Sequence, residues 1–357
     1  MKKIIFVDFL SLLLCLVAVS HFGQINISAQ QITTSKVNLG IITDEADAVL
    51  SILAKREAGQ EITESDWQKV FESEGYIRLQ KRERSLQRSF EDVDFKTFVL
   101  SENLVKRRRG LAEILATWKK ADINKIAERP LAYLPRKAQI SAKIYPVIKP
   151  RENSFVFDIS TNPAIFIFLD PEESKENFEN TVAHELHHIG FGTACPSVSV
   201  ADKIKKLPPN KQRVLKWLGA FGEGFAMLAA AGGASVHPHE FSSSADKERW
   251  DRDIANFNND LQTVERFFLD LESGTFSEDE ENKIARSFYG ATQGPWYTVG
   301  WQMAVVIEKT FGRSKLIEVM CDQRKLLLVY NRAVKKYNRR NNWQLALWSK
   351  ELVNKFK

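Results

Sequence analysis

The sequence predicts an α+β fold that is mostly helical, with a small sheet beside a helix that carries metal-binding side chains. Three observations favour this class. Apolar residues recur at helical spacing through residues 44–120 and again beyond residue 213. Short runs rich in Ile, Val, Phe and Tyr, bounded by prolines, lie within residues 142–169 and are typical of strands. The pattern H-E-x-x-H follows these runs, at residues 184–188.

The composition is that of an ordinary globular protein. The chain has 357 residues, of which 44% are hydrophobic and 27% charged. The formal net charge of +6 comes from 51 basic and 45 acidic residues and is spread along the chain. The basic run at residues 106–109 has no interleaved aromatic residues, so a solvated helix face explains it better than a nucleic-acid patch. We therefore expect no nucleic-acid partner.

The first 29 residues have the pattern of a secretory signal peptide. Lys2 and Lys3 precede an apolar stretch at residues 4–19, shorter than the roughly 20 residues that span a bilayer. Cleavage after Ser20 or Ala29 would leave a secreted or periplasmic chain, and membrane contact is expected only if the segment stays uncleaved.

The remaining cysteines are Cys195 and Cys321. Outside the cytoplasm they could form one disulfide, and two buried free thiols are an equally good interpretation.

The region at residues 30–138 is predicted to be helical. Residues 30–42 show little pattern, and we expect a mobile segment. Thr43 fits a helix N-cap, Gly59 fits a helix end, and Gly75 is expected to break the second helix. The expected helices cover residues 44–58, 63–71, 77–90 and 92–120.

Strands and further helices are expected in the rest of the chain. A sheet edge beside the H-E-x-x-H helix could bind an extended peptide by strand addition. Residues 203–209 are expected to form a basic, proline-ended loop. The expected strands cover residues 142–148, 154–159 and 164–169, and the later helices cover residues 213–231, 244–271, 277–288, 295–311, 326–334 and 343–352.

The pattern at residues 184–188 indicates a zinc site. Residues four apart share one face of a helix, so His184 and His188 can direct two imidazoles at one ion. Glu185 lies beside the first of them, where its carboxylate can act as a general base without binding the metal. The alternative is an amphipathic helix that carries these residues by chance.

Glu223 is the candidate for the third ligand that a catalytic zinc usually has. It is the one acidic residue in an otherwise apolar helix, and a buried carboxylate is costly unless a cation or a metal compensates it. The alternative is a salt bridge with a lysine or arginine of the basic loop. A histidine six residues past His188 would complete another zinc pattern, but Ala194 is there.

His184-Glu185-x-x-His188 followed by Glu223-Gly224-Phe225-Ala226 resembles the gluzincin metallopeptidases, whose third ligand is a glutamate on a second helix. The G-A-M-E-N segment of their aminopeptidase branch has no counterpart upstream. The layout as a whole is more similar to a little-studied family of bacterial zinc-dependent peptidases, catalogued only as a domain of unknown function. The resemblance covers roughly residues 140–310 and is firm at the motifs.

The resemblance implies a zincin-like metallopeptidase domain at residues 139–357, with one Zn²⁺ per chain and a peptide or protein as substrate. Gluzincins also use a tyrosine to hold the oxyanion of the tetrahedral intermediate. Tyr297 fits that role at the start of a helix, where Gly300 would let another helix approach closely. Tyr289 competes with it, and a tyrosine that only packs is the remaining alternative.

Other histidines and other functions are also compatible with the sequence. His187 is expected in a supporting or surface position. His237-Pro238-His239-Glu240 could supply a substrate contact or a second metal site, but a solvated loop explains it better. The same metal chemistry would serve a hydrolase acting on a non-peptide amide. A zincin-shaped binding protein without turnover is the second alternative.

Overall fold

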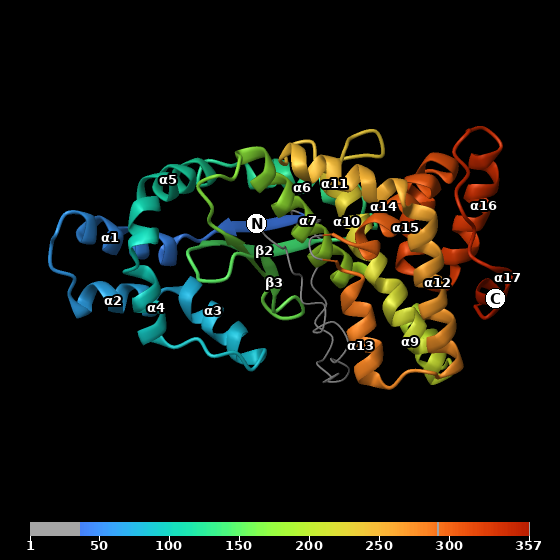
Figure 1. The fold of residues 1–357 in the computed structure, drawn as a ribbon, viewed down its shortest axis with the longest axis horizontal. Helices are drawn as coiled ribbons and strands as arrows, with labels where there is room; N and C mark the ends of the chain where they lie inside the picture. Colours follow the sequence, from blue (N-terminus) through green and yellow to red (C-terminus); the bar gives the residue numbers. More distant parts are fainter. Residues whose placement is uncertain (1–35, 291–292, 357) are drawn as a thin grey trace, which may run out of the picture.

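The computed structural model describes residues 36–290 and 293–356, so the expected signal peptide at residues 1–29 lies outside the described residues. Within them the fold is mostly helical α+β with a four-stranded mixed sheet, as the sequence predicts. Figure 1 shows an elongated molecule. The N-terminal helices lie at one end, the C-terminal helices at the other, and α7 lies between them.

The N-terminal helices differ from the prediction at two positions. The hydroxyl of Ser73 caps α3 by accepting the backbone N–H of Tyr76 at 3.3 Å, so Gly75 lies in a first helical turn and breaks nothing. Ser101 caps another helix in the same way and divides the long helix that we expected at residues 92–120. The helices are α1 (Asp44–Glu57), α2 (Glu64–Phe71), α3 (Glu74–Ser85), α4 (Asp92–Val99), α5 (Glu102–Trp118) and α6 (Ile123–Leu131).

The sheet contains the three expected strands and one more. The strands are β1 (Val37–Ile41), β2 (Ile140–Val147), β3 (Phe155–Phe157) and β4 (Ala164–Phe168), in the order β1-β2-β4-β3. Both β1 and β4 pair with β2 in parallel, whereas β3 is an edge strand antiparallel to β4. The expectation of a mobile segment is therefore wrong for residues 37–41. The predicted division of the chain into a helical region at residues 30–138 and a peptidase domain at residues 139–357 stays a prediction. β1 belongs to the first of these regions but pairs with β2 of the second.

The two faces of the sheet have separate cores because successive side chains point to opposite sides. Ile144 and Ile165 belong to the cluster that also contains the apolar side of α7 (Lys175–Ala194). On the other face Tyr145 and Phe166 stack with ring centroids 5.0 Å apart, and Leu79 of α3 belongs to the same cluster. One side of α7 therefore packs against the sheet, and this is the side that faces away from the C-terminal helices.

The C-terminal part is helical, with boundaries that partly differ from the prediction. The basic stretch expected as a loop includes the last three residues of α8, at residues 203–205. The helix expected at residues 244–271 is interrupted at Asn256, and α15 was not expected. In the last expected segment, residues 343–352, only residues 350–352 are helical, as the start of α17. The helices are α8 (Val198–Lys205), α9 (Pro209–Leu218), α10 (Gly222–Ala231), α11 (Ser244–Ala255), α12 (Phe257–Ser273), α13 (Glu278–Ser287), α14 (Pro295–Phe311), α15 (Arg313–Cys321), α16 (Leu326–Asn338) and α17 (Lys350–Asn354), with 3₁₀ turns η2 (Gly219–Phe221) and η3 (Gln323–Lys325).

The segment Pro209–Ala231, which comprises α9, η2 and α10, is long and apolar enough to cross a membrane. The structure buries 78% of its most apolar window inside the protein, so it forms part of the core. Gly232 ends it with a φ of +85°, a left-handed conformation that glycine adopts without steric cost.

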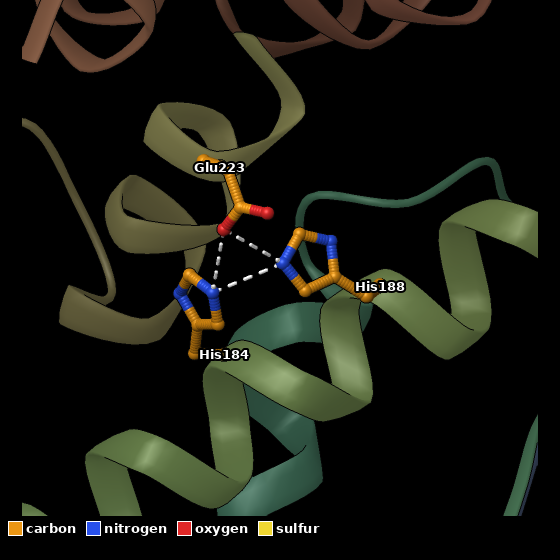
Figure 2. Close-up of side chains that lie close together, drawn as sticks. All are labelled: His184, His188 and Glu223. Carbon is orange, nitrogen blue, oxygen red and sulfur yellow. Dashed lines mark hydrogen bonds and ion pairs between the residues drawn. The ribbon is translucent and has the colours of Figure 1, made fainter. Parts of the chain in front are cut away.

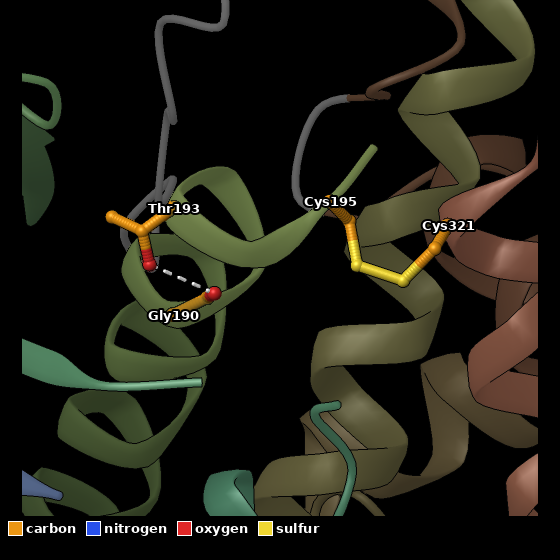
Figure 3. Close-up of a disulfide and its surroundings, with 4 residues drawn as sticks. All are labelled: Gly190, Thr193, Cys195 and Cys321. Carbon is orange, nitrogen blue, oxygen red and sulfur yellow. Dashed lines mark hydrogen bonds between the residues drawn. A yellow bond between two sulfur atoms is a disulfide. The ribbon is translucent and has the colours of Figure 1, made fainter. Parts of the chain in front are cut away.

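A disulfide joins Cys195 to Cys321, with their Cα atoms 4.9 Å apart (Figure 3). Cys195 follows the last residue of α7 and Cys321 is the last residue of α15. Of the two alternatives for these cysteines, the structure therefore has the disulfide, which ties the end of α7 to the C-terminal helices.

Candidate metal centre

Helix α7 carries the H-E-x-x-H residues in its buried second half. Ser174 begins the helix, and its hydroxyl accepts the backbone N–H of Asn177 at 3.1 Å. His184, Glu185 and His188 are all buried. Because residues four apart lie on one side of a helix, both histidine rings turn toward α10 (Figure 2).

Three side chains from two helices converge at one point. The Nε2 atom of His184 and the Nε2 atom of His188 lie 3.0 Å apart. The Oε2 atom of Glu223, in the first turn of α10, lies 3.2 Å from the first nitrogen and 3.3 Å from the second. Figure 2 shows these atoms as the corners of a small triangle. They are the only group of this kind among the described residues.

The donor atoms fit a zinc ion. Two atoms bound at about 2.1 Å to one tetrahedral ion lie roughly 3.4 Å apart, close to the separations seen here. Two imidazole nitrogens and one carboxylate oxygen are a ligand set of catalytic zinc sites, which leave a fourth position open. The second oxygen of Glu223 is buried and has no hydrogen-bond partner among the described residues. A cation at the centre of the triangle would compensate that buried charge.

The two histidines also determine the charge state of Glu223. Burial alone would raise the pKa of Glu223, but the charge of His188 and hydrogen bonds from both histidines lower it to about 2. No lysine or arginine of the described chain pairs with Glu223, whose ion-pair partners are the two histidines. The alternative of a salt bridge with the basic loop is therefore wrong for this structure.

Glu185 is the second buried carboxyl group of the centre. It is 0% exposed, and neither of its oxygens has a hydrogen-bond partner among the described residues. Burial raises its pKa, while the charges of His184 and His188 oppose that rise. Desolvation makes a carboxylate more basic, which is the direction that a general base requires.

Tyr297 reaches the centre from the first turn of α14. Its ring lies 6.4 Å from the ring of His184, centroid to centroid, and nearly parallel to it. Its hydroxyl is buried without a hydrogen-bond partner of ordinary geometry among the described residues. Burial and then the charge of Glu223 hold its pKa well above the usual value, so the hydroxyl keeps its proton. Tyr289 packs against Tyr297 with ring centroids 6.3 Å apart.

The two helices that carry the three donor atoms are held together by residues outside the group of donor atoms. His187 is buried, and its ring lies 4.5 Å from the ring of Phe225 on α10, so a surface position is excluded. Arg129 of α6 donates to the carbonyl oxygen of Ala230 on α10 at 2.8 Å and to that of Glu179 on α7 at 3.1 Å. The sequence does not reveal Arg129, because its partners are backbone carbonyls.

The histidine pair at residues 237–239 lies outside the metal centre. His239 is buried against Trp250, and its ring nitrogens lie 3.0 Å from the hydroxyl of Ser242 and 2.5 Å from Oε1 of Gln293. The expectation of a solvated loop is therefore wrong for His239. Burial lowers its pKa to about 4, which keeps it neutral at pH 7.

Comparison with known protein families gives a match. No curated protein matches the chain, and no solved structure does. Residues 43–339 match the model of one protein family, a stretch that covers well over half of the chain and contains every residue of the centre described above. The chain therefore belongs to the family described as "Putative zinc dependent peptidase (DUF5700)".

Proposed function

We propose that this protein is an extracytoplasmic zinc peptidase that holds one zinc ion per chain on His184, His188 and Glu223. The observation that carries the proposal is the buried triangle of two imidazole nitrogens and one carboxylate oxygen. Family membership supports zinc dependence and a peptide substrate. Glu185 is the general base, and Tyr297 stabilises the oxyanion.

The chemistry follows from what each side chain can do. A bound zinc ion would lower the pKa of a water toward about 7 and polarise the peptide carbonyl. The carboxylate of Glu185 accepts a proton from the attacking water and later delivers it to the nitrogen of the leaving amine. The hydroxyl of Tyr297 donates to the carbonyl oxygen as negative charge develops there.

Two features support a location outside the cytoplasm. The basic and apolar pattern of the first 29 residues is that of a signal peptide. The disulfide between Cys195 and Cys321 is a bond that persists in oxidising compartments. N-terminal sequencing of the secreted chain should give a start near residue 21 or 30. Recovery of intact Met1 from a soluble cytosolic pool would refute this part of the proposal.

Metal content and hydrolysis test the centre together. The purified chain should hold about one zinc and cleave members of a quenched-peptide panel, and a chelator should abolish cleavage. Glu185→Gln should keep the zinc and lose hydrolysis. Glu223→Ala should lower zinc occupancy, while His237→Ala, outside the centre, should leave it unchanged. A fully active Glu185→Gln variant would exclude Glu185 as the base.

The role of Tyr297 has a matched control in Tyr289. Tyr297→Phe removes the hydroxyl and keeps the ring, so kcat should fall about a hundred- to a thousand-fold with KM and zinc content nearly unchanged. Tyr289→Phe should leave kcat nearly unchanged. If Tyr289→Phe lowers kcat and Tyr297→Phe does not, the role belongs to Tyr289. A chain that binds zinc and cleaves no peptide would favour a non-peptide amide substrate or a binding protein without turnover.

A further inference from the structure

Two glycines bring helices α10 and α14 into direct backbone contact beside the metal centre. A Cβ atom on Gly224 would lie 2.0 Å from the backbone nitrogen of Trp301 and 2.3 Å from the carbonyl oxygen of Tyr297. A Cβ atom on Gly300 would lie 2.6 Å from the carbonyl oxygen of Phe221. Real Cβ atoms essentially never come within 3.0 Å of such neighbours. Each helix therefore needs glycine at the point where it crosses the other.

The contact joins two functional side chains. Gly224 directly follows Glu223, and Gly300 lies less than one turn after Tyr297. Helix α14 contributes no side chain to the group of donor atoms in the described structure. The packing of α14 against α10 therefore sets the distance from the Tyr297 hydroxyl to the metal centre.

Helix α10 is held against α7 by contacts that do not involve α14. Arg129 bonds to carbonyl oxygens of both helices, and Phe225 packs on His187. Extra volume between α10 and α14 would therefore displace α14 outward while the three donor atoms stay together.

We infer that Gly224 and Gly300 are positioning residues that hold Tyr297 at the metal centre, an inference that rests on the proposed function. Because glycine has no side chain, these two residues let the helices touch, and that contact places the hydroxyl of Tyr297. A change of about 1 Å in the place of a catalytic group can cost on the order of a hundred-fold in rate. Their effect on turnover should therefore exceed their effect on metal binding.

Gly222 provides the matched control, because it lies two residues before Gly224 on the same helix and a Cβ atom there meets nothing within 4 Å. Gly222→Ala should change neither zinc content nor kcat. Gly300→Ala and Gly224→Ala should lower kcat toward that of Tyr297→Phe, with zinc content retained and KM changed little.

A double-mutant cycle separates positioning from a loss of structure. If the glycine acts through the hydroxyl, Gly300→Ala should have little further effect on kcat in the Tyr297→Phe background. Equal fold losses in both backgrounds would overturn the inference while the proposed function stands. A wild-type chain that binds no zinc or cleaves no peptide would overturn the proposed function, and the inference with it.

Hydrogen–deuterium exchange of the wild-type chain gives a test that does not depend on whether the alanine variants fold. If α10 and α14 move as one unit, zinc bound at Glu223 should slow backbone exchange at residues 297–304 of α14 as well as in α10. Slowing confined to α7 and α10 would overturn the inference.

Discussion

Glu45 is a buried carboxyl group of α1 whose ionisation should set part of the pH dependence of stability. One of its oxygens accepts the backbone N–H of Ile148 at 3.0 Å, and the other has no hydrogen-bond partner among the described residues. Burial raises its pKa to about 8 from the ordinary value of 4.5, against the opposing effect of the bond from Ile148. The folded chain therefore keeps a proton that the unfolded chain loses.

The sign of the effect follows from these values. Below about pH 4.5 both states hold the proton, and between pH 4.5 and 8 only the folded state does, so stability falls as the pH rises through this window. Glu45→Gln keeps an acceptor for Ile148 and removes the ionisation. The free energy of unfolding of this variant should therefore increase relative to that of the wild type as the pH rises. The increase should be up to about 1.4 kcal/mol per pH unit across the window. Denaturant titrations at pH 5 and pH 8 that show a constant difference would contradict this.

At the scale of elements, Arg129 connects the two helices that carry the proposed ligands. Its guanidinium group bridges the carbonyl oxygens of Ala230 and Glu179. Removing it leaves those carbonyls without a charged donor and loosens α10 from α7. Arg129→Ala should therefore weaken zinc affinity and lower Tm. Arg136 is an exposed residue after α6, and Arg136→Ala should change neither. Unchanged zinc affinity in chelator competition with Arg129→Ala would show that the bridge does not position the ligands.

The strands were partly predictable from local sequence. β2, β3 and β4 are runs of apolar and aromatic residues bounded by prolines. These prolines locate the strands to within a few residues. β1 carries too short a pattern to be recognised, and its partner in the sheet, Ile140 opposite Val37, lies far along the chain. Strand order depends on such long-range pairing, which local patterns do not encode.

The candidate centre was largely predictable because its signals are local. The helical repeat places His184 and His188 on one face, and the single charge in an apolar helix indicates Glu223. The burial of His239 was not predictable, since it depends on Trp250 and Gln293, which lie later in the chain. The close contact between α10 and α14 was predictable from one helix only. Gly300 indicated that another helix approaches closely, but the sequence did not indicate that Gly224 is its partner.

At the scale of the whole molecule, the metal centre lies where two apolar cores meet. The inner side of α7 belongs to the core shared with the sheet and the N-terminal helices. Phe225 of α10 and Tyr297 of α14 belong to the core of the C-terminal helices. The donor atoms from α7 and α10 therefore come together only when both cores are formed.

The disulfide should matter most for global stability. It links residues 126 positions apart, and in the chain-entropy model a loop of this length restricts the unfolded chain strongly. Its removal should cost about 2–5 kcal/mol. Differential scanning calorimetry should show a lower Tm after reduction of the wild type, and no effect of reductant on the double variant Cys195→Ser/Cys321→Ser. An unchanged Tm in the reduced wild type would show that the bond does not contribute to stability.

The same bond closes a covalent circle from Cys195 to Cys321. Glu223 and Tyr297 lie on this circle, whereas His184 and His188 lie just before it. A single backbone cut within the circle, for example at the exposed Val198 of α8, therefore cannot separate the two histidines from the glutamate. The nicked chain would run as one species on a non-reducing gel and as two after reduction. The disulfide thus keeps the three donor atoms on one covalent assembly after a first cut in this stretch.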